Sequence, residues 1–335
     1  MPRRDIVVIG ASAGGVEALG ALVRELPPDL DAAVFVVLHL AAEHKSVLPR
    51  ILSSAGPLPA KHARNGEAIV TNRIFVARPD HHLLVHESHI RVVRGPRENG
   101  HRPAIDPLFR TAARSFGPRV IGVILSGALD DGTAGLVSVK TQGGLALVQD
   151  PNEALVDAMP RSAMENVEVD HILSAAEIGR LMPRLVAQEV PAAPASRSPV
   201  LEVESSLHLH GGTEGALKIG QPSSLACPDC GGVLNEVHDG DLLRFRCSVG
   251  HAFAPESLYL QQNTQLEGAL WAALRALEEQ AGLARRMAVR ARELRHLKSA
   301  LRYDERAESA EGQARTVREA LRLGAPPKSE ADRSE

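Results

Sequence analysis

The sequence predicts an α/β fold: a doubly wound, mainly parallel sheet with a β-hairpin insertion, followed by a small cysteine-containing module and a C-terminal helical region. Two observations carry this prediction. Short β-branched runs alternate with helical patterns from residue 6 to about 188, as in a parallel sheet covered by helices. The chain of 335 residues is also long enough for one sizeable core and a smaller module.

Five short apolar runs are the expected strands. Each is rich in Val, Ile or Leu and is bounded by turn residues, which suits buried parallel strands. The expected strands are 6–9, 33–38, 74–77, 120–125 and 146–149. The expected helices are 16–26, 46–54, 107–116, 132–141 and 175–187. Between residues 81 and 95, two strand-like runs flank Glu87 and Ser88, which predicts the β-hairpin insertion.

The rest of the chain divides by composition into four further parts after a domain at 1–188. Residues 189–222 lack periodicity and are rich in Pro, Ser and Gly, which predicts a linker. Residues 223–255 form the cysteine-containing module, residues 256–323 a helical region, and residues 324–335 a disordered tail. The helical region carries apolar residues near helical spacing, at Leu270, Leu274, Leu277, Leu294 and Leu301. A coiled coil is one interpretation; an amphipathic helix packed on its own domain is the commoner one.

Composition excludes several classes of protein. A net charge of -3 and 3% aromatic residues argue against a nucleic-acid-binding protein. The longest apolar runs fall short of the roughly 20 residues of a membrane helix, so no membrane insertion is expected. The apolar run at 6–9 is too short for a secretory signal. We therefore expect a cytoplasmic protein.

The loop "GASAG" at residues 10–14 follows the first expected strand. It satisfies G-x-S-x-G, in which small neighbours let a sharp strand-to-helix turn expose a nucleophilic serine. A dinucleotide site would need glycine where this chain has Ser12, and an acidic residue at the second strand end, where it has His39. Both departures argue against a nucleotide cofactor.

Further chemistry-bearing residues follow other strands. His39 follows 33–38, and Asp130 and Asp131 follow 120–125, so the carboxyl ends of three strands bring Ser12, His39 and an aspartate to one edge. A serine nucleophile needs a base, and the base needs an acceptor that fixes its tautomer. The residues alone do not choose between the aspartates. The ordinary alternatives are a structural histidine at a strand end and a helix N-cap at the aspartates.

Five segments resemble the catalytic domain of the CheB-type chemotaxis protein-glutamate methylesterases. They are "VVIGASAGGVEAL", "VVLHLAAEHKSVLPRIL", "RPAIDPLFRTAA", "GVILSGALDDGTAG" and "DAMPRSA", in the family's order and covering nearly all of 5–187. The resemblance implies a serine esterase that hydrolyses glutamate methyl esters on receptor signalling helices. It also implies deamidation of certain glutamines there, and no cofactor for catalysis.

By motif, the resemblance assigns Ser12 as nucleophile, His39 as base and Asp131 as the orienting carboxylate. Backbone N–H groups near Ala13, Gly14 or His39 are the candidate donors to the oxyanion. The alternative functions are a related hydrolase with another acyl substrate and a non-catalytic adaptor that docks to receptors. The complete set of three side chains favours the enzyme.

The implied partners are methyl-accepting chemotaxis-type receptors, through their methylated signalling helices. The family's best-known members carry an N-terminal receiver domain, which this sequence lacks, so a separate receiver protein is a candidate partner. Ala13 and Ala128 replace a hydroxyl residue and a methionine that are common in the family. Arg102 and Arg110 are candidate contacts for an acidic receptor surface.

All three cysteines lie in one stretch, as Cys227-x2-Cys230-x16-Cys247-x3-His251. Two close pairs of ligands separated by hairpin-like sequence predict a Cys3His structural Zn²⁺ site, and His238 is the competing fourth ligand. A redox pair is disfavoured because "CPDC" opens onto "GG" rather than a helix. A disulfide is disfavoured by the odd cysteine count. This cysteine-containing stretch resembles the zinc-ribbon-like tails of some members of the same esterase group.

Overall fold

Seven parallel strands form the central sheet of the computed structural model, which describes residues 1–39, 46–191, 199–210, 219–240 and 242–323. The strands are β1 (Ile6–Ala11), β2 (Ala33–Leu38), β3 (Ala60–His62), β4 (Arg73–Val76), β7 (Val120–Ile124), β8 (Leu145–Gln149) and β9 (His171–Leu173). Their order is β3-β4-β2-β1-β7-β8-β9. The direction of winding therefore changes at β1, where a doubly wound sheet places its functional site.

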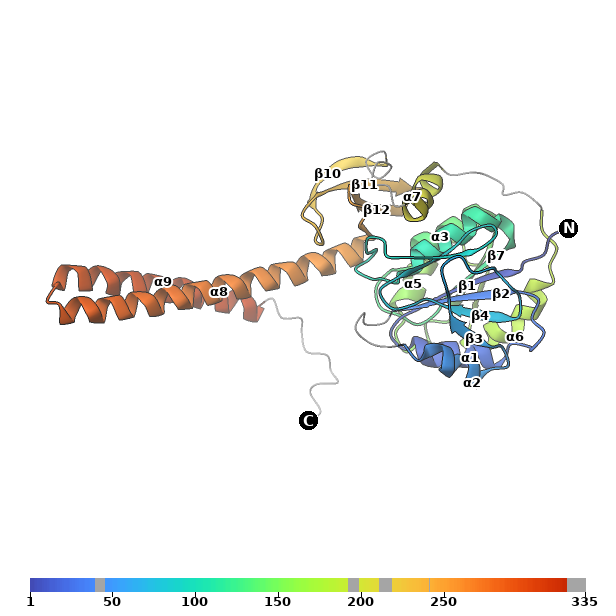
Figure 1. The fold of residues 1–335 in the computed structure, drawn as a ribbon, viewed down its shortest axis with the longest axis horizontal. Coiled ribbons are helices and arrows are strands. Elements are labelled where there is room, and N and C mark those ends of the chain that lie inside the picture. The colour runs from blue at the N-terminus through green and yellow to red at the C-terminus, as the bar shows by residue number, and fades with distance from the viewer. Residues whose placement is uncertain (40–45, 192–198, 211–218, 241, 324–335) are drawn as a thin grey trace. The chain divides into compact units, whose positions relative to one another are not determined.

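Helices cover both faces of this sheet (Figure 1). The helices α1 (Gly15–Arg24), α2 (Leu48–Ala55) and α6 (Ala175–Val186) pack on one face. The other face carries α3 (Ile105–Phe116), α4 (Thr133–Thr141) and α5 (Ala158–Asn166), with the short 3-10 helix η1 (Gly117–Arg119) before β7. Because both faces are covered, every residue of β1 and β2 is buried, which explains their continuous apolar sequences.

The structure confirms the predicted fold class. The five expected strands and five expected helices are present within two residues of their expected ends. The insertion is an antiparallel hairpin of β5 (His82–Val85) and β6 (Ile90–Val93). The strands β3 and β9 and the helix α5 were not expected from the sequence. The two strands have only three residues each, and α5 contains Pro160 in its first turn, so none carries a long periodic pattern.

The expected linker is wrong over residues 199–210, which form the helix α7 (Pro199–His210). The helix lies against α3 (Figure 1). It buries Leu201 at 3% exposure, but also Glu204 at 1%. A helix that buries a carboxylate has no clear apolar stripe, which is why periodicity did not reveal it.

A four-stranded antiparallel sheet forms the second layer of structure in the same compact unit, which spans Met1–Leu258. It contains β10 (Gln221–Ala226), β11 (Val233–Asp239), β12 (Leu242–Cys247) and β13 (Ala252–Phe253) in chain order. We call residues 221–254 the Cys module. Its buried apolar cluster is small: Cys227, Leu234, Phe245, Cys247 and Phe253, with Leu258 packed against them from just beyond the module. So small a core is insufficient for an independent fold without a further constraint.

The expected helical region consists of α8 (Pro255–Glu293) and α9 (Leu297–Leu323), which run antiparallel (Figure 1). The buried residues of the two helices after Leu258 are mostly alanines rather than a leucine seam: Leu274 is buried, as are Ala281, Ala284, Ala288, Ala291, Ala300, Ala307, Ala310 and Ala314. Leu294 and Leu301 are exposed, so the expectation that they face a packed surface is wrong. Within the described residues, none of the helices has the length and apolar character of a membrane span.

Candidate active site and metal centre

Ser12 lies on a tight turn between β1 and α1. Its backbone N–H donates to Ser126 O at 2.9 Å, and Gly15 N–H donates back to Ser12 O at 2.9 Å. Gly14 begins the helix with φ 74°, and a Cβ there would lie 2.7 Å from the Ser126 hydroxyl oxygen. Only glycine suits both requirements. The pattern "GASAG" therefore reflects the geometry of this turn.

The loop after β7 closes on the Ser12 turn. The Ser126 hydroxyl donates to Ala13 O at 2.7 Å, and Ser126 N–H donates to the Gln149 side chain at 2.7 Å. At Gly127 a Cβ would lie 2.9 Å from Ser12 Cβ and 2.1 Å from the Met159 sulfur. The loop can approach the serine this closely only because residue 127 has no side chain.

His39 lies directly after β2 and contacts both other members of the expected set. Its Nδ1 is 3.1 Å from Ser12 Oγ, and its Nε2 is 2.7 Å from Asp131 Oδ2. A carboxylate only accepts, so Nε2 carries the proton and Nδ1 presents its lone pair to the serine. The side chains of His39 and Asp131 are 6% and 2% exposed. Ser12, His39 and Asp131 thus form one hydrogen-bonded series.

The carboxylate of Asp131 is held at the N-terminus of α3. Asp131 Oδ2 accepts from Ile105 N–H at 2.7 Å, and Oδ1 accepts from the Asn99 side chain at 2.9 Å and Asp106 N–H at 3.3 Å. Burial acts to raise the pKa of Asp131, but hydrogen bonds from His39 and Ile105 and the His39 charge lower this pKa to about 2. The carboxylate therefore stays ionised at neutral pH.

Asp130 has a different environment. It accepts hydrogen bonds from Glu256 N–H at 3.2 Å and from the Ser257 hydroxyl, in the first turn of α8. Asp130 thus acts as an N-cap supplied from a distant part of the chain. This geometry separates the two aspartates, which the residues alone had not done.

His101 is a neighbour of the site that sequence reasoning missed. Its ring stacks on His39 with centroids 3.7 Å apart and planes 12° apart. Burial, followed by the charge of His39, lowers the pKa of His101 to about 4. The tight turn at 98–101 carries both His101 and Asn99. It lies directly before the segment "RPAIDPLFRTAA", so its nearness to a family motif was the only sign of it in the sequence.

Two of the three candidate oxyanion donors remain. His39 N–H donates to Ala11 O at 3.2 Å, so that candidate is wrong. The N–H groups of Ala13 and Gly14 have no acceptor among the described residues. They precede the N-terminus of α1, where backbone N–H groups favour a negative oxygen.

Arg110 does not face a partner, contrary to expectation. It is 1% exposed, and its guanidinium donates to both Glu98 oxygens, at 2.7 and 2.6 Å. Arg102 binds the Asp80 carboxylate and the Gly95 carbonyl. Arg110 therefore has an internal structural role.

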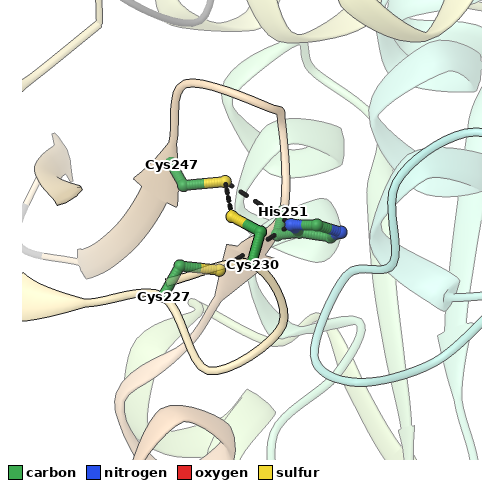
Figure 2. A group of neighbouring side chains, drawn as sticks. All are labelled: Cys227, Cys230, Cys247 and His251. Carbon is green, nitrogen blue, oxygen red and sulfur yellow. Dashed lines mark hydrogen bonds between the residues drawn. The ribbon is translucent and has the colours of Figure 1, made fainter. Parts of the chain in front are cut away.

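The four expected metal ligands converge at one point of the Cys module (Figure 2). Cys227 and Cys230 lie between β10 and β11, Cys247 ends β12, and His251 precedes β13. Their ligand atoms all lie within 4.8 Å of one another. His238 is not among them, so the competing fourth ligand is placed elsewhere.

The separations fit a tetrahedral ion. Sγ atoms of Cys230 and Cys247 are 3.7 Å apart, and His251 Nδ1 lies 3.7 Å from Cys227 Sγ and 3.5 Å from Cys247 Sγ. Tetrahedral zinc with bonds of about 2.0–2.3 Å places its ligands about 3.5–3.8 Å apart. A disulfide would need about 2.0 Å. The donor set therefore fits Zn²⁺.

The surrounding groups also suit a metal. The contact between the Cys227 and Cys247 thiols lowers the pKa of Cys247, with further lowering from His251 and Cys230, and raises the pKa of Cys227. The Asp229 carboxylate lies 3.9 Å from His251 Nε2, on the ring edge away from the cysteines. At this distance the carboxylate is beyond hydrogen-bond reach and acts on the histidine through its charge.

A serine, an imidazole and a carboxylate in hydrogen-bonded series at the carboxyl edge of a parallel sheet define the class of serine hydrolases with an α/β fold. The comparisons are more specific. The family model described as CheB methylesterase matches residues 7–182, and the chain belongs to this family.

Relatives and a solved structure agree with this assignment. A "putative protein-glutamate methylesterase/protein-glutamine glutaminase" of Leptospira interrogans is 40% identical over 182 residues, covering 54% of this chain and 94% of the relative. A protein-glutamate methylesterase/protein-glutamine glutaminase of Anaeromyxobacter dehalogenans is 39% identical over 183 residues, covering 55% of this chain and 54% of the relative. The crystal structure of the Thermotoga maritima CheB methylesterase catalytic domain matches with a TM-score of 0.53 and 31% identity, covering 56% of this chain and all of that one.

Proposed function

We propose that this protein is a serine esterase that hydrolyses glutamate methyl esters on methyl-accepting chemotaxis-type receptors, and deamidates certain glutamines there. The observation that carries the proposal is the hydrogen-bonded series of Ser12, His39 and Asp131 within the family's domain. The substrate class comes from the relatives, which are described as protein-glutamate methylesterases/protein-glutamine glutaminases.

In the proposed reaction, Ser12 Oγ attacks the ester carbonyl carbon while His39 Nδ1 takes the hydroxyl proton. Asp131 holds Nε2 and stabilises the imidazolium that forms. The carbonyl oxygen becomes negative against the N–H groups of Ala13 and Gly14, each worth about 3 kcal/mol. The C–O bond to the methoxy group then breaks, and His39 returns the proton so that methanol leaves.

The acyl-enzyme is hydrolysed by the same groups. Water attacks the acyl carbon while His39 accepts its proton, and Ser12 leaves with that proton as the glutamate carboxyl group is released. Deamidation of a glutamine follows the same course, with ammonia as the leaving group in place of methanol. The proposed steps use only these side chains, the backbone N–H groups and water.

We further propose that Zn²⁺ occupies the Cys module in a structural role. Four protein ligands leave no open position for substrate, as in structural zinc sites. We propose an esterase domain at 1–188, the Cys module, which was expected at 223–255 and spans 221–254 in the structure, and a helical region at 256–323. The tail at 324–335 lies outside the described residues.

The proposed partners are the methylated signalling helices of the receptors, with a separate receiver protein as a candidate regulator. We propose a cytoplasmic location. Three cysteines placed as metal ligands rather than as disulfides suit a reducing compartment.

The test is methanol release from a methyl-esterified receptor signalling fragment. We expect release by the wild type and a loss of at least about 10³-fold in Ser12→Ala, because the nucleophile is removed. Ser88→Ala, an exposed serine in the hairpin connection, is the matched control and should release methanol normally. Undiminished release by Ser12→Ala would contradict the assignment. Receptor binding without release would support the adaptor instead.

A further inference from the structure

We propose that the Cys module is a positioning element of the esterase: its strand β13 fixes Asn99, and Asn99 fixes the carboxylate of Asp131. Metal loading of the module would then set the turnover of a site to which the metal is not bound. The inference rests on the proposed function only in taking Asp131 as the group that orients His39.

Asn99 makes hydrogen bonds to both parts. On the module side, its backbone N–H donates to Ala252 O and its Oδ1 accepts from Ala254 N–H, both at 2.8 Å. On the esterase side, its Nδ2 donates to Asp131 Oδ1 at 2.9 Å and to Asp106 Oδ2 at 3.1 Å. Asn99 is 3% exposed, so a broken bond would leave a buried polar group unpaired. The orientation of the amide, and hence of Asp131, depends on β13.

Buried charges fix the residue before Asn99. Glu98 accepts from Arg110 of α3 and from Arg246 of β12, the latter at 2.9 Å. All three side chains are 1% exposed. Buried ion pairs of this kind are costly to break, because each partner would remain charged and unpaired. The turn at 98–101 is therefore tied to the module as well as to the esterase.

The loop that carries Asp131 also contacts the segment at 252–257, which contains β13 and the start of α8. The adjacent residue Asp130 accepts from Glu256 N–H and the Ser257 hydroxyl, which follow β13 by a few residues. Residues 252–257 thus contact Asn99, which donates to Asp131, and Asp130, which precedes it in the chain. A shift of this segment would move the carboxylate relative to His39.

The metal ligands lie directly before this segment. His251 precedes Ala252, and the turn from Cys247 to His251 closes through Cys247 N–H donating to His251 O at 3.0 Å. The Arg246 guanidinium donates to Gly250 O within the same turn at 2.9 Å. Because the module has so small a core, ion binding supplies much of its order. Loss of the ion would loosen β13 and release Asn99.

The experiment uses the full-length protein and compares Asn99→Gly and Cys230→Ser with the control His238→Ala, an exposed histidine on β11. Glycine accepts the φ of 52° at position 99, so the backbone bond to Ala252 is kept while the amide is lost. Three quantities are measured. The first is bound zinc, and the second is the low-field proton resonance of the His39–Asp131 hydrogen bond. The third is the rate of p-nitrophenyl acetate hydrolysis, divided by the number of reactive serines that a fluorophosphonate labels.

We expect Asn99→Gly to keep its zinc, to shift or lose the low-field resonance, and to lose at least about 10-fold in kcat per labelled serine, since small misplacements in a catalytic site are costly. Cys230→Ser should lose zinc and show the same two defects, and His238→Ala should resemble the wild type. A purely structural role would lower the number of labelled serines but leave kcat per serine unchanged.

The proposal would be overturned if Asn99→Gly and Cys230→Ser both kept the low-field resonance and the kcat per labelled serine of the wild type. The resonance decides the question even if the wild type does not hydrolyse p-nitrophenyl acetate. Failure of the receptor assay would remove the proposed substrate while leaving this coupling testable by the same signal.

Discussion

The ring of His101 packs against His39, the proposed base, without a hydrogen bond to it. Stacked at 3.7 Å on His39, it excludes water from one face of the base. Its lowered pKa means that it stays neutral when His39 becomes protonated, so it adds no repulsive charge to the site. The same burial makes His101 a source of pH-dependent stability.

For His101 the pKa is about 4 in the folded state and about 6.5 in an unfolded chain. The unfolded state therefore binds more protons between these values, and stability falls as the pH falls from 6.5 to 4. The loss from this group is about 3 kcal/mol at most. We expect His101→Gln to flatten this part of the pH dependence, measured by urea unfolding at several pH values. An unchanged slope would contradict the assignment of that slope to His101.

At the scale of the element, α7 is a helix that the spacing of apolar residues does not predict. Glu204 occupies its buried side and accepts from Arg244 through both carboxylate oxygens, at 2.9 and 3.0 Å, and from Arg246 at 3.1 Å. Burial acts to raise the pKa of Glu204, but the charges of Arg244, Arg246 and Arg110 lower it to about 2. The helix is thus stabilised by charges from β12 and α3 rather than by an apolar stripe.

We expect Glu204→Ala to lower the free energy of unfolding by about 3–5 kcal/mol, because it leaves buried arginines without their carboxylate. The control on the same helix is Glu202→Ala. Glu202 pairs with Arg114 near the surface, and its loss should cost less than about 1 kcal/mol. Urea unfolding at neutral pH compares the two. Equal effects would show that the buried charges are not what holds α7.

At the scale of the whole molecule, the first unit combines the parallel sheet and the Cys module, since Met1–Leu258 form one compact unit. The buried pairs Glu98–Arg246 and Glu204–Arg244 join elements that are far apart in the sequence. The module therefore should not unfold independently of the sheet.

Removal of zinc should consequently destabilise this unit as a whole. At a free zinc concentration about 1,000 times the dissociation constant, bound metal contributes about 4 kcal/mol, and a chelator should remove that contribution. Unfolding of the wild type is monitored by circular dichroism with and without chelator. We expect the transition of the sheet to shift to lower stability when the chelator is present. Metal-free Cys230→Ser should not respond to the chelator. If the chelator left the unfolding transition of the sheet unchanged, the module would be shown to unfold separately from the sheet.

The sequence by itself predicted the parallel sheet, the strand-end positions of Ser12 and His39, and the four residues that converge as candidate metal ligands. These follow from local patterns: buried strands are continuous apolar runs, functional side chains follow strand ends, and metal ligands keep short spacings. The residue patterns alone left Asp130 and Asp131 open, and the resemblance favoured Asp131; the tertiary structure shows the physical difference, because Ser257, the partner of Asp130, lies 127 residues away. The tertiary structure also revealed α7 and the buried alanines of α8 and α9. These features depend on contacts between residues remote in the chain, and no local pattern records which distant groups will meet.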